Sequence, residues 1–358
     1  MTFEKVVEKL ICLQFRHSSA VLHLHTVCFQ FNCDRYSCFV GRQIFRSLLC
    51  CRAMSDMDNP VRVMVWATHR TCSSVLMKSL SNLPDSQVIF EIYSTAYYDG
   101  PERFDTNVLV EEPVNAAIKV GEDGLIKGPG SGFPGSICSY DWARRQLEAD
   151  YPGKTVIVAK EIAPWLCGRY KDIPRGYRHV FLIRHPTKMF PSWKKLNREF
   201  LEEERGVKVG MEDFELDQLP PKFVSPGLDY KEIFDLWQFV KDGNLDPDPI
   251  VVDSDDLVCN PAQVLSSLCK HLGIPYTDSL LSWQQGTECV EDWLVDSRLK
   301  YIIENMAIFH NFRESTCFMK PATVSKVPDV ASFSADLQRC IHSSMPYYST
   351  MYEQRFKY

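Results

Sequence analysis

The sequence predicts an α/β protein whose central parallel sheet is flanked by helices. Three stretches support this prediction, at residues 61–83, 177–197 and 249–272. In each one, a short apolar and β-branched run leads through a polar turn into a segment whose apolar residues have helix-like spacing. Continuous apolar strands are typical of parallel sheets, because helices cover both faces of such sheets.

The first stretch combines a strand with a turn that suits an anion. Val61–Ala67 is the strand, and the turn at 68–74 lies at the N-terminus of the following helix. Free backbone N–H groups and the positive end of a helix dipole attract anions at such a position. A simple helix cap has a similar sequence and remains an alternative. The turn contains one cation and four small or hydroxylated residues: Arg70, Thr71, Cys72, Ser73 and Ser74.

This turn differs from the phosphate loop of nucleoside-triphosphate enzymes, G-x-x-x-x-G-K-[ST]. Ala67 stands at the first glycine, Cys72 at the second and Ser73 at the lysine. A Walker-type ATPase or nucleotide kinase is therefore disfavoured, although a kinase would share the strand, loop and helix.

A second strand is predicted at 87–90, and it ends at Glu91. Because ligands of parallel sheets lie outside the carboxyl ends of the strands, Glu91 is expected beside the turn after the first strand. Its carboxylate is a candidate general base. The alternatives are a solvated side chain or an ion-pair partner for Arg70. Further along, the glycine-rich stretch 121–135 is predicted to be a loop, and a later β-rich run leads to Lys160.

The stretch 177–197 places a second arginine at the end of a strand. The strand is predicted at 180–183, Arg184 follows it, and Pro186 precedes a helix-like segment that carries Ser192. A guanidinium group binds a phosphate dianion bidentately, and a hydroxyl can occupy a further phosphate oxygen. In isolation, Arg184 could equally cap the sheet edge.

Taken in order, these segments resemble sulfotransferases, and the resemblance covers roughly residues 61–320. Residues 70–74 are similar to the family's 5′-phosphosulfate loop, P-[RK]-S-x-[ST]-T, and Arg184 with Ser192 is similar to its 3′-phosphate motif. Sequence motifs from the C-terminal part of the family also recur here. They are Asp253, Asp256-Leu257, Pro261, Cys269, Leu272-Gly273-Ile274-Pro275, Trp283 and the stretch 310–318 that starts at His310. The closest branch is that of soluble bacterial and invertebrate proteins.

The resemblance implies a P-loop-like fold and a sulfuryl transfer from 3′-phosphoadenosine 5′-phosphosulfate (PAPS) to a hydroxyl or amine of a small acceptor. It implies no metal. By the same resemblance, Arg70 and residues 71–74 bind the 5′-phosphosulfate, while Arg184 and Ser192 bind the 3′-phosphate. Arg70 would also neutralise the charge that develops on the leaving oxygen, as preorganised donors do in other group transfers.

Departures from the family's pattern leave the catalytic base open. The hormone- and phenol-sulfating branch has Trp after its loop and Lys-x-His after a central strand, whereas this chain has Val75 and Lys160-Glu161-Ile162. We therefore predict Glu91 as the base, with His310 and Lys160 as alternatives. Cys72 replaces a loop glycine, and its Cβ would crowd the donor if the backbone needs positive φ. A noncatalytic nucleotide-binding relative thus remains an alternative.

Composition sets the broad class. The chain has 358 residues, 45% of them hydrophobic and 24% charged, with a net charge of −6. This charge argues against a nucleic-acid binder, and no apolar run approaches the ~20 residues of a membrane span. The 14 cysteines show no C-x-x-C pair, which disfavours a zinc knuckle or a thioredoxin-like site. Without a convincing signal peptide, we expect reduced thiols in an intracellular, cytoplasmic protein.

Residues 1–58 lack clear periodicity and are predicted to be a poorly structured extension of the α/β domain at 59–358. A mitochondrial targeting segment is the alternative, because such segments favour Arg and Ser over acids. Glu4 and Glu8 weaken it. The acceptor and the oligomeric state are not predicted.

Overall fold

The computed structural model of the chain describes residues 59–104, 118–128, 130–320 and 327–358. The extension predicted at 1–58 lies outside the described residues. Among the described helices, none is both long enough and apolar enough to cross a membrane.

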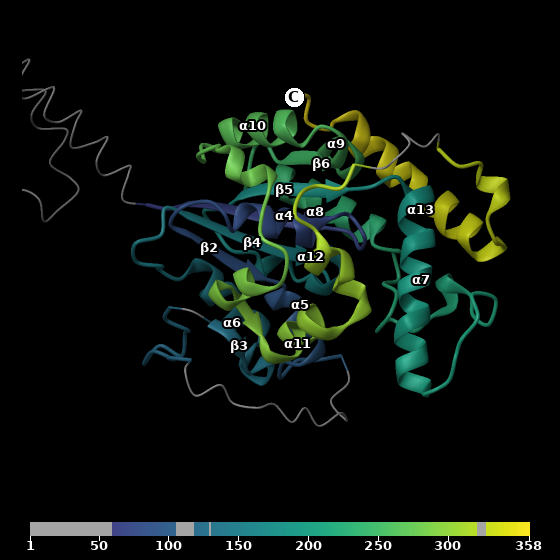
Figure 1. Ribbon diagram of the computed structural model, residues 1–358, viewed down its shortest axis with the longest axis horizontal. Coiled ribbons are helices and arrows are strands. Elements are labelled where there is room, and N and C mark those ends of the chain that lie inside the picture. Colours follow the sequence, from purple (N-terminus) through teal and green to yellow (C-terminus); the bar gives the residue numbers. More distant parts are fainter. Residues whose placement is uncertain (1–58, 105–117, 129, 321–326) are drawn as a thin grey trace, which may run out of the picture. The chain divides into compact units, whose positions relative to one another are not determined.

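The core of the fold is a seven-stranded sheet in which every pairing is parallel (Figure 1). The strand order is β3-β7-β2-β4-β1-β5-β6. The predicted α/β fold with a central parallel sheet is thus confirmed. The strands are β1 (Val61–Ala67), β2 (Ser86–Phe90), β3 (Gly130–Phe133), β4 (Val156–Ile162), β5 (Arg178–Ile183), β6 (Ile250–Asp253) and β7 (Leu294–Asp296).

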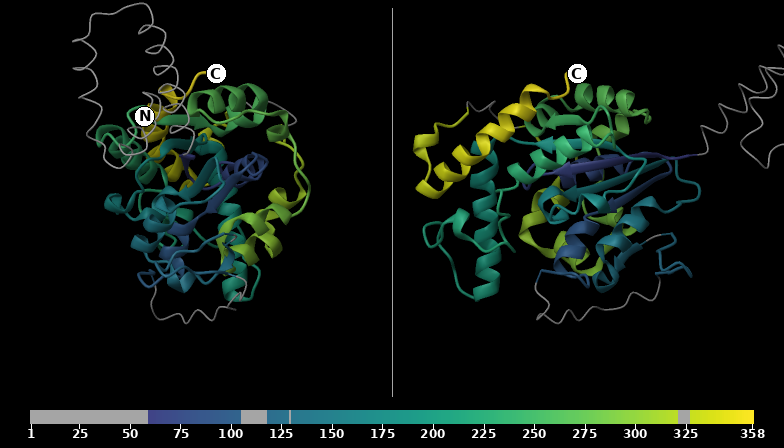
Figure 2. Two further views of the ribbon diagram at one scale, coloured as in Figure 1. Left: turned by 90° about the vertical axis from the view of Figure 1, so that its left-hand side faces the viewer. Right: turned by 180° about the vertical axis from the view of Figure 1, so that it is seen from behind.

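Helices cover both faces of this sheet (Figures 1 and 2). They are α4 (Ser73–Leu80), α5 (Ile92–Tyr98), α6 (Tyr140–Glu148), α7 (Pro186–Arg205), α8 (Tyr230–Asp242), α9 (Ser254–Cys259), α10 (Pro261–Leu272), α11 (Ser297–Asn305), α12 (His310–Glu314) and α13 (Ala335–Glu353). One prediction was wrong: the glycine-rich stretch 121–135 contains the edge strand β3, and Gly130 packs closely against Leu294 of β7.

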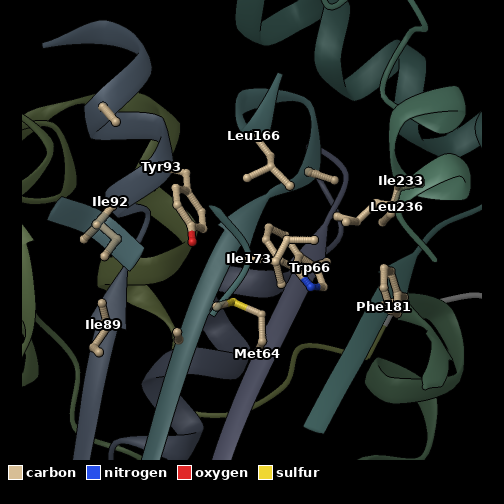
Figure 3. Close-up of a cluster of buried hydrophobic side chains, with 14 of the residues drawn as sticks. Met64, Trp66, Ile89, Ile92, Tyr93, Leu166, Ile173, Phe181, Ile233 and Leu236 are labelled. Atoms are coloured by element: carbon tan, nitrogen blue, oxygen red, sulfur yellow. The ribbon is translucent and has the colours of Figure 1, made fainter. Parts of the chain in front are cut away.

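Alternation along each strand divides the apolar side chains between two cores. On β1, Met64 and Trp66 face one core, while Val63 and Val65 face the other, and all four are at most 1% exposed. Figure 3 shows the first core, where Trp66 lies near Tyr93 of α5, with their ring centroids 6.1 Å apart. Burying one such large side chain contributes about 1.5–3 kcal/mol.

The register of the central strands brings their carboxyl ends to one edge. Ala67 at the end of β1 pairs with Ile162 of β4 and Leu182 of β5. Loops that leave these strands therefore start side by side, although their residues are about a hundred positions apart in sequence. This edge carries the site described below.

Two long helices, α7 and α13, pack against each other. Helix α7 begins with Pro186, which suits the first helical turn because its missing N–H would have no partner there. It ends at Arg205, and the next residue, Gly206, has a φ of 66° that suits a left-handed C-cap. Lys194 of α7 forms a buried ion pair of 2.8 Å with Asp336 of α13, which runs beside α7 in Figure 1.

Candidate active site

A cavity of about 1220 Å³ opens at the carboxyl edge of the sheet. Its lining comes from the loop after β1, the ends of β2, β4 and β5, and helices α7 and α11. Every residue predicted to bind the donor lines it: Arg70, Thr71, Cys72, Ser73, Ser74, Arg184 and Ser192. Glu91 and Lys160 line it as well.

The loop between β1 and α4 presents a row of free backbone donors. Arg70 and Cys72 have φ of 61° and 60°, in the left-handed region, which turns the chain sharply into α4. In the described part of the chain, the consecutive N–H groups of residues 70–75 have no hydrogen-bond partner. Successive unpaired N–H groups beside a helix N-terminus form an anion-binding concavity.

The hydroxyls of this loop have different roles. The Thr71 hydroxyl donates to the Thr68 carbonyl at 2.8 Å and is buried, so it stabilises the turn itself. The hydroxyls of Ser73 and Ser74 form no hydrogen bond with described residues, and both residues line the cavity. These two hydroxyls are thus free to bind a ligand in the cavity.

Two arginines converge on the loop. Arg70 Nε donates to Ser192 Oγ at 3.0 Å, and Arg184 Nη1 donates to the Arg70 carbonyl at 3.0 Å. Arg184 Nε is buried without a hydrogen-bond partner, and its nearest carboxylate oxygen belongs to Asp255, 3.8 Å away. Burial lowers the pKa of Arg70. A buried, unpaired guanidinium N–H indicates a site for an anion.

Cys72 has the positive φ at which a Cβ is strained. Burial raises the pKa of its thiol, so the side chain stays neutral despite the nearby Arg184 and Arg70. The side chain therefore adds bulk to the loop without adding charge.

Glu91 forms an ion pair with Lys160, not with Arg70. The expectation that Glu91 lies directly beside the loop after β1 was wrong, because β4 separates β2 from β1. Lys160 is 1% exposed, and its ammonium lies 4.9 Å from the centre of the Phe90 ring. Ile162 also lines the cavity and adds an apolar wall here.

His310 lies apart from this arrangement. It is exposed at the start of α12 and does not line the cavity. The structure brings in charged residues that the sequence analysis did not single out. Arg298 Nε donates to Asp99 at 2.8 Å, and His69 Nδ1 lies 2.6 Å from Asp229 Oδ2. His69 lies within the predicted anion turn, whereas no local pattern marks Asp229.

Comparison with known proteins gives partial matches. Branched-chain-amino-acid aminotransferase-like protein 1 of Arabidopsis thaliana is 26% identical over 238 residues, which are 64% of this chain and 33% of that protein. Protein 2 of the same name and organism is 25% identical over 229 residues, 63% of this chain and 32% of that protein. The chain thus spans about a third of the length of these curated relatives.

Two solved structures are also similar. A sulfotransferase from Alicyclobacillus acidocaldarius is 16% identical with a TM-score of 0.41, over 63% of this chain and 87% of that one. A sulfotransferase domain from the curacin biosynthetic pathway is 17% identical with a TM-score of 0.43, over 81% and 98%. Residues 246–355, from the approach to β6 through α13, match the family model described as a sulfotransferase domain.

Proposed function

We propose that this chain is a PAPS-dependent sulfotransferase that acts on a hydroxyl or amine of a small acceptor. The observation that carries the proposal is the row of unpaired N–H groups at residues 70–75, beside the half-buried side chains of Arg70 and Arg184. Such a row suits one phosphate, and a separate guanidinium beside it suits a second.

The loop after β1 is suited to the 5′-phosphosulfate. Its N–H groups and the positive end of α4 would stabilise the charge that develops on the leaving phosphate oxygen. The free hydroxyls of Ser73 and Ser74 add donors, and Arg70 supplies a full positive charge next to them.

Arg184 and Ser192 are suited to the 3′-phosphate. Arg184 offers the buried Nε–H that lacks a partner. Ser192 Oγ already accepts from Arg70, so its own hydroxyl proton is left to donate to a phosphate oxygen. ATP has no 3′-phosphate and would leave these donors unused. We call the loop at 70–75 together with Arg184 and Ser192 the donor half of the cavity.

The opposite part of the cavity is suited to an uncharged acceptor. We call Glu91, Lys160, Asp99 and Arg298 the acceptor half. Each cation there is paired with a carboxylate, so the charges largely cancel. Trp165 and Tyr98 contribute aromatic surface to the same wall.

The test is the thermal shift caused by 3′,5′-adenosine bisphosphate, with ATP in parallel. At ~100 times Kd a ligand adds ~2.7 kcal/mol of stability, which raises Tm by several degrees. We expect a shift with the bisphosphate only, lost in Arg184→Ala and kept in Arg145→Ala, whose exposed side chain pairs with Asp141. Equal shifts with both nucleotides would exclude a 3′-phosphate site, and no shift at all would exclude the donor.

A noncatalytic nucleotide-binding relative is the second candidate, and Cys72 favours it. A Cβ at a φ of 60° occupies the loop where the donor has to approach closely. The two candidates differ in turnover. Binding of the bisphosphate without any release of sulfate from PAPS would select this second function.

A further inference from the structure

Resting on the function proposed above, we infer that His69 is the general base of the transfer and that Asp229 positions it. The pair comes from distant parts of the chain. His69 lies two residues after the end of β1, and Asp229 is the N-cap residue of α8.

The hydrogen bonds of Asp229 determine the tautomer of the imidazole. Its Oδ2 accepts from the His69 backbone N–H at 2.9 Å and lies 2.6 Å from His69 Nδ1, while Oδ1 accepts from the Ser225 hydroxyl at 3.1 Å. A carboxylate with donors on both oxygens acts only as an acceptor. Nδ1 therefore carries the proton, and Nε2 keeps a free lone pair.

The side chain of Asp229 contacts His69 and does not cap α8. It occupies the N-cap position of α8, where an aspartate ordinarily accepts from the first backbone N–H groups of the helix. Here its side chain forms no cap hydrogen bond. Leu228 and Asp229 also have φ of 53° and 66°. Strained non-glycine residues persist where the surrounding structure enforces them, often at functional sites.

Two tryptophans hold the imidazole in place. The Trp193 ring stacks on it with a centroid distance of 4.7 Å and an interplanar angle of 14°. The Trp165 ring meets it edge-on at 5.7 Å. His69 still lines the cavity with its side chain 18% exposed, and Nε2 has no hydrogen-bond partner among the described residues. The free nitrogen is thus oriented and accessible from the cavity.

The sheet order places His69 at the boundary of the two halves. β1 lies between β5, which leads to Arg184, and β4, which carries Lys160. His69 immediately precedes Arg70 of the donor loop. Glu91 lies one strand further away, and its Oε1 is occupied by the Lys160 ammonium. His69 is therefore better placed than Glu91 to take a proton during transfer.

In the proposed step, the acceptor oxygen attacks sulfur while Nε2 of His69 takes the hydroxyl proton. The bond between sulfur and the 5′-phosphate oxygen breaks, and its electron pair stays on that oxygen. The products are the sulfate ester and adenosine bisphosphate. The imidazolium, stabilised by Asp229, then returns its proton to water. No oxidant, reductant or further reactant is needed.

The experiment avoids the unidentified acceptor by using water and phenol as acceptors. Release of radiolabelled sulfate from PAPS and transfer to phenol are followed in single turnovers, and binding of 3′,5′-adenosine bisphosphate is followed by calorimetry. His69→Asn keeps an N–H near the position of Nδ1 and has nothing at Nε2. We expect it to slow both reactions by about 10²–10⁴-fold with unchanged bisphosphate affinity.

Three further variants separate chemistry from structure. Asp229→Asn should lower kcat without changing bisphosphate affinity, because the tautomer is no longer fixed. Added imidazole should restore part of the rate to His69→Gly but none to Asp229→Asn. His310→Asn, a change of the same kind at an exposed site outside the cavity, should behave as the wild type.

Each alternative result is decisive. If the wild type binds no bisphosphate or releases no sulfate, the proposed function fails, and the role of His69 fails with it. If the wild type turns over and His69→Asn matches it, only the role of His69 is overturned. A third result is that His69→Asn loses both its bisphosphate affinity and its rate, and that imidazole does not restore the rate of His69→Gly. His69 would then be a structural residue of the loop.

Discussion

The two halves of the cavity treat charge in opposite ways. In the donor half, Arg70 forms no ion pair with any described carboxylate, and Arg184 has only a distant one in Asp255. In the acceptor half, Lys160 contacts Glu91 directly and Arg298 lies 2.8 Å from Asp99. The same kinds of side chain thus leave positive charge unpaired on one side and cancel it on the other.

This difference matches the ligands that we propose. A buried charge without a partner is costly, so unpaired arginines indicate that an anion completes the donor half. Where each cation already has its carboxylate, a charged ligand would have to displace a partner. A neutral hydroxyl compound avoids that cost. Variants that remove one charged partner from either half test this difference in charge pairing.

The largest effect is expected in the acceptor half, for Lys160→Met. The change leaves the Glu91 carboxylate in a largely buried place without its cation, and losing one partner of a buried pair costs about 3 kcal/mol or more. Urea unfolding should show this loss, and the double variant with Glu91→Gln should recover part of it. The matched control is Arg145→Met, which breaks a mostly exposed pair and should leave the unfolding midpoint unchanged. An unchanged midpoint in Lys160→Met would show that the pair does not stabilise this half.

The second prediction separates acid damage to the sheet from acid inhibition of the site. His179 of β5 is buried, and its Nδ1 accepts from Trp66 Nε1 at 2.9 Å. Burial lowers its pKa from 6.5 to about 4. The unfolded chain therefore binds this proton more tightly, so stability falls as the pH drops below 6.5.

Between pH 6.5 and 5 this residue should cost roughly 2 kcal/mol of unfolding free energy. His179→Asn keeps an acceptor for Trp66 but does not titrate, so it should lose this part of the pH dependence even if it is less stable overall. Urea titrations of both proteins at several pH values make the comparison. A parallel loss in both would assign the acid sensitivity to other groups.

The third prediction concerns Asp255, a carboxylate near the donor half. Asp255 Oδ1 lies 3.8 Å from Arg184 Nε, while its Oδ2 contacts Lys188 at 2.6 Å. Asp255→Asn should free Arg184 and tighten bisphosphate binding by about fivefold, which corresponds to the ~1 kcal/mol of a partly exposed pair. Asp256→Asn is the matched control, because Asp256 pairs with Arg355. Weaker binding in Asp255→Asn would mean that Asp255 orients Arg184 instead of competing for it.

The donor half could be predicted from sequence better than the acceptor half, for a physical reason. Arg70 and Arg184 each follow a continuous apolar strand, and parallel pairing brings the ends of such strands together. β3 was missed because Gly130 and Gly132 interrupt any apolar run. Asp229 could not be anticipated, since it reaches His69 across 160 positions from a segment without periodicity. Its role is evident only from the partly buried hydrogen bond to His69, which forms in the folded chain.

The smallest effect is expected for Cys72→Gly, within the donor loop. Glycine adopts a φ of 60° without strain, whereas other residues pay about 1 kcal/mol there. Part of that gain is offset because Cys72 packs partly against the core. We therefore expect a rise of at most about 1 kcal/mol in unfolding free energy. Bisphosphate binding should also tighten, because the loop loses a Cβ at the proposed donor site. Cys72→Ala removes the thiol but keeps the strained Cβ, so it should show neither gain. If alanine and glycine bind the bisphosphate equally well, the thiol and not the backbone conformation limits how closely a phosphate can approach this loop.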